Sequence, residues 1–246
     1  MQDKPPIFWL KEDDFSFPHP ELASAEGILA AGGDLSPERL LIAYRMGIFP
    51  WYNLGEPILW WSPDPRFVLF PDDLKVSKSM RPYFNQQKFT VTIDYCFEHV
   101  MRSCSDIKRE KQNFGTWITE DMIEGYVKLH EKGFAHSIEV WKGEELVGGL
   151  YGISIGKCFF GESMFSKEKN ASKFGFITLV RRLKELGFWL IDAQQPTKYL
   201  ASMGAVNIHR TDFLKILRRN QLEQTIKGNW GNLLTEQPTD NQLIIL

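Results

Sequence analysis

The sequence lacks several features that would assign it to a familiar class of protein. It has only three cysteines in 246 residues, Cys96, Cys104 and Cys158, and none of them forms a CxxC pair. An odd count without that spacing indicates neither a disulfide framework nor a zinc ribbon, so reduced thiols are the simpler interpretation. No apolar run approaches the ~18 residues that span a bilayer, and MQDKPP does not begin a signal peptide. We therefore expect a cytoplasmic protein without a membrane segment.

Charge of one sign is not in excess either. The formal net charge is -2 and the isoelectric point is near 6.2. Such a balance gives no overall signature of nucleic-acid binding, so any polyanionic partner has to be bound by a local patch.

The common catalytic motifs are absent as well. The sequence contains no GxSxG, HExxH, Walker loop or GxGxxG. The sequence therefore contains none of the motifs that would indicate a serine hydrolase, a zinc protease, an NTPase or a dinucleotide-binding enzyme.

The pattern that is present predicts an α+β protein. Residues 1–65 are rich in proline, glycine and aromatic side chains, with one clear helix between an N-cap at Ser36 and a stop at Gly47. From residue 66 onward, strands and helices alternate. We expect a small N-terminal domain, 1–65, followed by a mixed-sheet domain, 66–246.

Three consecutive strands are expected between His136 and Phe165. Gly143 and Gly156 mark the two turns, and apolar residues alternate with polar ones between them. Further signals predict strands over 66–70, 89–93 and 188–192, and helices over 119–133 and from about 170 to 187. The last of these helices is expected to place Phe174, Ile177, Val180 and Leu183 on its core face.

Two carboxylates stand out because they lie in apolar strands. Glu162 is surrounded by phenylalanine and methionine, and Asp192 ends the apolar run FWLID, with Gln194 just beyond. A buried acid needs either a partner or a catalytic task. The sequence alone favours a structural ion pair or a backbone hydrogen bond slightly over catalysis.

Other chemical groups have ordinary explanations beside functional ones. Trp51 and Trp117 could fill a core or stack on a flat ligand, with similar weight. The segment 74–88 contains Lys78, Arg81 and Lys88 without an acid, and taken alone it is more simply a solvated face than a phosphate site. Cys96, His99 and Cys104 lack an evident fourth ligand, so buried thiols are favoured over a metal site.

The strand-strand-helix-strand order is similar to that of acetyl-CoA-dependent acetyltransferases. Those enzymes carry a glycine-containing pyrophosphate loop before the helix, and the segment SKEKNASK lacks it. The order fits that class, but the cofactor loop does not.

A more specific resemblance extends over approximately residues 27–213. The segments GGDLSPERLLIAYRMGIFPW, WWSPDPR, GTWIT, HSIEVW with LVGGLYG, GESMFS, NASK and LIDAQ follow in order, and together they resemble the leucyl/phenylalanyl-tRNA protein transferases. The resemblance implies an acetyltransferase-like (GNAT-like) C-terminal domain that uses aminoacyl-tRNA in place of acyl-CoA, without cofactor or metal.

The implied reaction moves Leu or Phe, and in some cases Met, from its tRNA ester to the α-amino group of a protein that begins with Arg or Lys. The new peptide bond marks that protein for degradation. We expect a monomer. An acetyl-CoA-dependent acetyltransferase and a non-enzymatic RNA-binding module are the alternatives.

The resemblance also implies roles for individual residues. Asp192 would polarise Gln194, whose carbonyl oxygen would accept a proton or hydrogen bond from the amine. Glu162 would orient the amine or recognise the acceptor's cation. Further residues are implied as the aminoacyl side-chain pocket (Leu150, Phe159, Met164, Leu179, Ile191), the terminal adenosine site (Trp51, Trp117) and the tRNA-backbone contacts (Lys78, Arg81, Lys88).

Three positions depart from what the family leads us to expect. Leu150 stands where some relatives have Met, Tyr199 stands where we expect His, and Asn85-Gln86-Gln87 replaces additional positive charge. The first difference bears on the choice between Leu and Phe, and the last on tRNA affinity.

Overall fold

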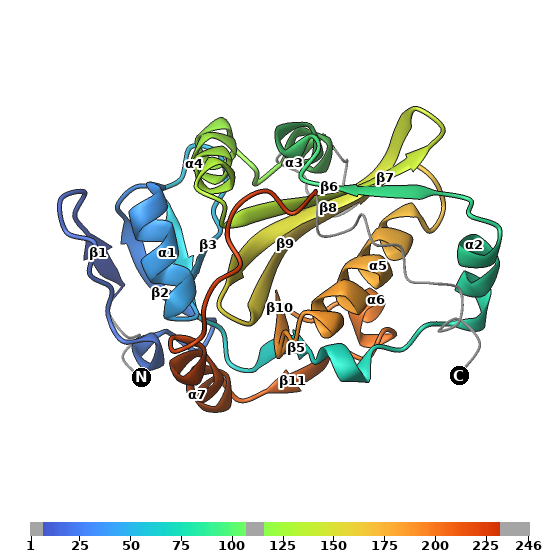
Figure 1. Ribbon diagram of the computed structural model, residues 1–246. Helices are drawn as coiled ribbons and strands as arrows, with labels where there is room; N and C mark the ends of the chain where they lie inside the picture. The colour runs from blue at the N-terminus through green and yellow to red at the C-terminus, as the bar shows by residue number, and fades with distance from the viewer. Residues whose placement is uncertain (1–6, 107–115, 232–246) are drawn as a thin grey trace.

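The computed structural model describes residues 7–106 and 116–231, which form two β-sheets with helices packed around them (Figure 1). The smaller sheet has the order β1-β2-β4-β3. Its strands are β1 Phe8–Leu10, β2 Ile28–Gly32, β3 Phe49–Pro50 and β4 Leu59–Trp61. The larger sheet consists, in spatial order, of β11 Val206–Ile208, β5 Arg66–Leu69, β10 Leu190–Gln194, β9 Cys158–Ser166, β8 Glu145–Ile155, β7 Ala135–Lys142 and β6 Thr90–Ile93.

The small sheet, which includes Trp60 and Trp61, was not predicted from the sequence. Both lie in β4, where Trp60 is fully buried and donates its Nε1 hydrogen to the carbonyl of Gly32. The prolines at 57 and 63 flank the strand and do not interrupt it, so the backbone N–H groups of β4 remain available for pairing.

The predicted first helix is confirmed as α1, Pro37–Arg45. The Ser36 hydroxyl accepts a hydrogen bond from the backbone N–H of Arg39 at 3.4 Å, and Pro37 occupies the first turn. Gly47 follows with φ of 74°, a conformation that favours glycine.

The three-strand prediction is also confirmed, as β7 Ala135–Lys142, β8 Glu145–Ile155 and β9 Cys158–Ser166. Neighbouring strands in this trio are antiparallel, and Gly143 and Gly156 make the turns with positive φ. The other strands of the large sheet are β5 Arg66–Leu69, β6 Thr90–Ile93, β10 Leu190–Gln194 and β11 Val206–Ile208. The strand expected over 188–192 begins two residues later and includes Asp192 and Gln194.

Helices cover both faces of the large sheet (Figure 1). On one face lie α3, Phe97–Ser105, and α4, Glu120–Glu131, with α1 beside α4. On the other face lies α5, Ala171–Glu185. The core face expected for this last helix is confirmed, because Phe174, Ile177, Val180 and Leu183 are all buried. The apolar residues therefore form two clusters, one on each face of the sheet.

The remaining helices are short or lie near the sheet's edge. They are η1 Pro20–Leu22, η2 Pro71–Asp73, η3 Lys78–Met80, α2 Arg81–Asn85, α6 Lys198–Ala201 and α7 Arg210–Asn220. After α7 the chain runs back toward β6 (Figure 1). There the Trp230 ring stacks on His136 with centroids 3.7 Å apart, and its backbone N–H donates to Asp94. The C-terminal segment is thus fixed to the central sheet.

Residues 7–106 and 116–231 together form a mixed α+β structure, as expected. None of the helices in this described part combines the length and apolar composition needed to cross a bilayer. The charged residues 108–111, for which the sequence predicts a loop, lie outside the described residues.

Candidate active site

The two parallel strands β9 and β10 separate after Phe160 and Asp192. They pair from Cys158 and Leu190 to Phe160 and Asp192. Beyond that point β9 continues along β8, while β10 continues along β5. Polar side chains that follow the point of separation therefore face a gap in the sheet's hydrogen bonding, which is a common place for a ligand site.

A β-bulge places Glu162 at this separation. In the pairing of β8 with β9, Tyr151 is opposite Ser163 and Gly152 is opposite Gly161, so Glu162 is the extra residue. The bulge also reverses the alternation of side chains: Phe160 and Phe165 pack in the same cluster, although regular pleating would separate them. Glu162 lies on the same side of the sheet as Phe160 and faces α1 and α4.

A second bulge shapes the end of β10. Asp192 is opposite Val68 and Gln194 is opposite Phe67, which leaves Ala193 as the extra residue. Gln194 has φ of 62°, an uncommon conformation for a residue other than glycine. The Asp192 Oδ1 atom accepts a hydrogen bond from the Gln194 backbone N–H at 2.9 Å, which holds this conformation.

Asp192 is bound tightly to Arg66, the first residue of β5. The guanidinium donates through Nε to Oδ1 at 2.8 Å and through Nη2 to Oδ2 at 2.6 Å. The Phe49 and Phe213 rings lie 4.8 and 4.7 Å from the guanidinium carbon. Asp192 therefore contacts Gln194 through the backbone, and both of its oxygens are occupied by a buried cation.

The side chain of Gln194 reaches Glu162 instead. Its Nε2 atom donates to Glu162 Oε1 at 2.8 Å, which bridges the separated strands. This orientation leaves the amide oxygen of Gln194 as the atom that is available to an incoming N–H donor.

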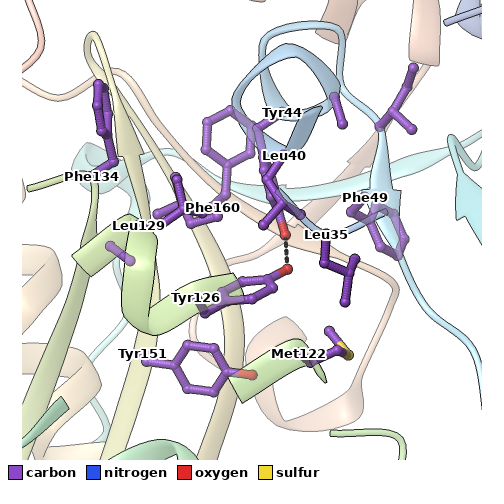
Figure 2. Packing of buried hydrophobic residues seen from close by; sticks show 14 of the residues in the cluster. Leu35, Leu40, Tyr44, Phe49, Met122, Tyr126, Leu129, Phe134, Tyr151 and Phe160 are labelled. Atoms are coloured by element: carbon purple, nitrogen blue, oxygen red, sulfur yellow. Dashed lines mark hydrogen bonds between the residues drawn. The ribbon is translucent and has the colours of Figure 1, made fainter. Parts of the chain in front are cut away.

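Two tyrosines complete the surroundings of Glu162. The Tyr44 hydroxyl contacts Oε1 at 2.7 Å, and the Tyr126 hydroxyl contacts Oε2 at 3.2 Å. The two hydroxyl oxygens also contact each other, as the dashed line in Figure 2 marks. Figure 2 shows apolar side chains around this pair, among them Leu40, Met122 and Phe160. Glu162 therefore lies in a polar cluster with apolar walls.

Burial raises the pKa of the Glu162 carboxyl to about 7, against the opposing effect of the hydrogen bonds from Tyr44, Tyr126 and Gln194. The pKa values of both tyrosines are raised as well, first by burial and then by the charge of Glu162. A carboxyl that titrates near neutrality can exchange a proton with an amine.

The five residues expected to form a side-chain pocket lie together on the α5 face of the sheet. Leu150 is opposite Met164, and Phe159 is opposite Ile191. All except Met164 are at most 3% exposed and belong to one apolar cluster, against which Met164 packs. They are on the opposite face of the sheet from Tyr44 and Tyr126.

The two tryptophans differ in exposure. Trp51 is 37% exposed and packs against Trp61, whereas Trp117 is 8% exposed within the core cluster. The segments that carry the two tryptophans are hydrogen-bonded to each other, because the hydroxyls of Tyr52 and Thr119 lie 3.0 Å apart.

Lys78, Arg81 and Lys88 are all exposed and lie in or beside η3 and α2. In Figure 1, α2 lies beyond the far end of α5, away from α1. The three possible metal ligands of the sequence do not form a cluster: no group of three His, Cys, Asp or Glu able to hold a metal occurs among residues 7–106 and 116–231.

Three residues that contact Glu162 or Asp192 were not identified from the sequence. Arg66 opens an apolar strand, where an unexplained cation signals a buried anion elsewhere. Tyr44 and Tyr126 lie on the core faces of their helices, where a phenolic hydroxyl requires a polar partner. These signals indicate that partners exist but do not identify them.

Comparisons with known proteins indicate the same family over most of the chain. Residues 68–218 match the model of the family described as leucyl/phenylalanyl-tRNA protein transferase, and residues 33–64 match that of its N-terminal domain. A protein of that name from Syntrophus aciditrophicus is 56% identical over 87% of this chain and 90% of its own length. One from Christiangramia forsetii is 58% identical over 82% of this chain and 95% of its own.

A solved structure, described as that of L-PGS from Bacillus licheniformis, matches 67% of this chain and 54% of its own. The sequence identity is 16% and the TM-score is 0.38. A score of this size does not establish a shared fold.

Proposed function

The chain belongs to the leucyl/phenylalanyl-tRNA protein transferase family, and from this premise we propose which substrates it takes and which residues act on them. It is an aminoacyltransferase that uses an aminoacyl-tRNA as donor and a protein as acceptor. The donor carries Leu or Phe, with Met as a further candidate. The acceptor is a protein that begins with Arg or Lys, and the added residue marks it for degradation.

The observation that carries the assignment of roles is the hydrogen bond between Gln194 and Glu162 across the separated strands. The acceptor amine approaches this bridge, and the amide oxygen of Gln194 accepts one of its N–H groups. Because a neutral amide is a weak base, its main contribution is to position the nitrogen. Asp192 acts on Gln194 through the backbone N–H and keeps the bulge in shape.

The transferred side chain enters the apolar cluster of Leu150, Phe159, Met164, Leu179 and Ile191. Met164 is the most accessible of the five, and a flexible thioether suits a pocket that admits both Leu and Phe. Four of the five are buried against one another, so entry of the substrate requires their side chains to rearrange.

The tRNA contributes two further contacts in this proposal. Trp51 and Trp117 hold the terminal adenosine, with the exposed Trp51 as the principal stacking surface. Lys78, Arg81 and Lys88 contact the phosphate backbone through charge and do not read its sequence.

We also propose the organisation of the whole chain. A boundary near residue 65 is supported by the division into two sheets, whose strands end at Trp61 and begin again at Arg66. An acetyltransferase-like arrangement of residues 66–246 is supported by the parallel pair β9 and β10, joined by α5 and separated beyond Phe160. The protein acts as a monomer in the cytoplasm.

The decisive experiment measures transfer of labelled Leu from charged tRNA to two peptides that begin with Arg and with Ala. We expect label on the Arg peptide alone. Absence of transfer to either peptide would refute the proposed activity, and binding of acetyl-CoA by calorimetry would point to an acetyltransferase.

A further inference from the structure

The contacts around Glu162 require more hydrogens than the two tyrosines can supply. Tyr44 and Tyr126 contact each other at 2.5 Å, Tyr44 contacts Oε1 at 2.7 Å, and Tyr126 contacts Oε2 at 3.2 Å. Each hydroxyl has one hydrogen, and an ionised carboxylate has none. With Glu162 ionised, one of the three oxygen pairs must therefore meet without a hydrogen between them.

Protonation of Glu162 on Oε2 removes this conflict. The acid then donates to Tyr126, Tyr126 donates to Tyr44, and Tyr44 donates to Oε1, so that each contact contains one hydrogen. Oε1 remains an acceptor for the Gln194 amide. The arrangement is a closed ring with room for one additional proton.

We propose that Glu162, Tyr44 and Tyr126 form a proton-accepting ring that deprotonates the acceptor amine before it attacks the tRNA ester. This inference rests on the proposed function, because it places the amine beside Gln194. Glu162 is the proton acceptor, whereas Tyr44 and Tyr126 are positioning residues that act through it.

Two protons leave the acceptor nitrogen during the reaction. An α-amino group with an ordinary pKa of about 7.7–8.0 arrives mainly as ammonium at neutral pH and cannot attack a carbonyl. One N–H bond breaks and an O–H bond forms on Glu162, which converts ammonium and carboxylate into neutral amine and acid. During ester aminolysis a second proton leaves the nitrogen with the ribose oxygen of the tRNA. The ring then returns its proton to solvent when the products leave.

The surroundings of Glu162 suit a group that must titrate near neutrality. Burial raises its pKa to about 7, close to that of the amine it would deprotonate. The titratable and charged groups that face it are Tyr44 on α1, Tyr126 on α4 with Tyr151 packed against it from β8, and Asp192 on β10, whose charge is compensated by Arg66.

The first test is the pH dependence of kcat/KM for the Arg peptide in the wild type, Tyr44→Phe and Tyr126→Phe. The amine of the peptide titrates identically in all three assays, so a difference between the pH profiles must come from a group of the enzyme. Because both hydroxyls contact the Glu162 carboxyl and contribute to its pKa, removing either one should displace the acidic limb by on the order of one unit. Tyr52→Phe is the matched control, since it removes a tyrosine hydrogen bond to Thr119 and should leave the limb in place.

The second test does not depend on transfer. The infrared difference between the free wild type and Glu162→Gln should contain the carbonyl band of a protonated acid well below pH 7, and the band should disappear well above it. In Tyr126→Phe the band should move to higher frequency, because the acid loses its hydrogen-bond acceptor.

The outcomes separate this inference from the proposed function. Transfer by the wild type with an acidic limb that stays fixed in both tyrosine variants would overturn the ring and leave the transferase activity intact. Absence of the acid band at every pH would also overturn it, even if a tyrosine variant failed to fold. If the infrared band is observed but no transfer occurs, the protonated ring would stand. Its role in deprotonating the acceptor amine and the proposed function would both be refuted.

Discussion

Arg66 and Asp192 form a two-pronged ion pair between β5 and β10, with side chains that are 1% and 0% exposed. The carboxylate of Asp192 is also the acceptor that holds the backbone of Gln194. The pair therefore connects the stability of the sheet to the geometry of the candidate site, and changes at Asp192 affect both.

Replacing Asp192 with Asn should destabilise the fold by about 3–5 kcal/mol, because it leaves the Arg66 guanidinium buried without a charged partner. Urea denaturation measures the change. The double variant Arg66→Met with Asp192→Leu should be less destabilised, since it removes both charges. A double variant as unstable as Asp192→Asn would show that the buried charge is not the cause.

Replacing Gln194 with Gly should separate activity from stability. Glycine relieves the strain of the positive φ, which is worth roughly 1 kcal/mol, and this offsets removal of the hydrogen bond to Glu162. We expect a nearly unchanged free energy of unfolding and a decrease in transfer of roughly 10²-fold or more. Gln195→Gly is the matched control, because this exposed neighbour should tolerate the change with full transfer activity.

Glu162→Gln should increase the free energy of unfolding of the protein at alkaline pH. The pKa of Glu162 is raised from 4.5 in the unfolded chain to about 7 in the fold, so the stability it provides is present below pH 4.5 and is lost as the pH rises through about 7. Glutamine does not titrate. The variant should therefore gain on the order of 3 kcal/mol relative to the wild type between these two pH values.

Glu139→Gln provides a comparison for that experiment. Glu139 is a buried acid on β7 whose pKa is also raised by burial, and it contacts Thr92 and Ser137. Its variant should show the same direction of pH dependence while retaining transfer. A pH-independent difference between wild type and Glu162→Gln would contradict the prediction.

The two tryptophans should respond differently to alanine. Trp117 is in the core, so its replacement should cost about 3–5 kcal/mol of folding free energy. Trp51 is partly exposed, and its replacement should weaken binding of Leu-tRNA by about 1–3 kcal/mol with a smaller effect on folding. Fluorescence titration and thermal unfolding measure the two effects, and unaltered tRNA affinity in Trp51→Ala would exclude a stacking role.

The basic residues should be visible in the salt dependence of tRNA binding. Replacing Lys78 and Lys88 with Gln should reduce the slope of log K against log salt by about 0.7–0.9 for each phosphate that the variant no longer neutralises. Lys128→Gln with Lys142→Gln is the control, since these exposed lysines pair with Glu124 and Glu168. An equal change in both double variants would indicate a general charge effect.

The sequence by itself determined the elements whose signals are local. The helix between Ser36 and Gly47, the three strands from β7 to β9 and the core face of α5 follow from capping, turn glycines and periodicity, all of which act within a few residues. The long ordered motifs also identified the family. The small sheet was missed because its strands are only two to five residues long, too short for a period to be recognised.

Only the tertiary structure decided which groups meet at the site. Bulges occur at Glu162 and just before Gln194, whose side chains meet, and alternation along a strand cannot predict an extra residue. The tyrosine partners of Glu162 and the arginine partner of Asp192 come from α1, α4 and β5, separated from them by 36 to 126 positions. The sequence showed that buried acids require partners, but long-range packing selected Arg66 for one and two tyrosines for the other, because hydrogen bonds form between groups that the fold brings within reach.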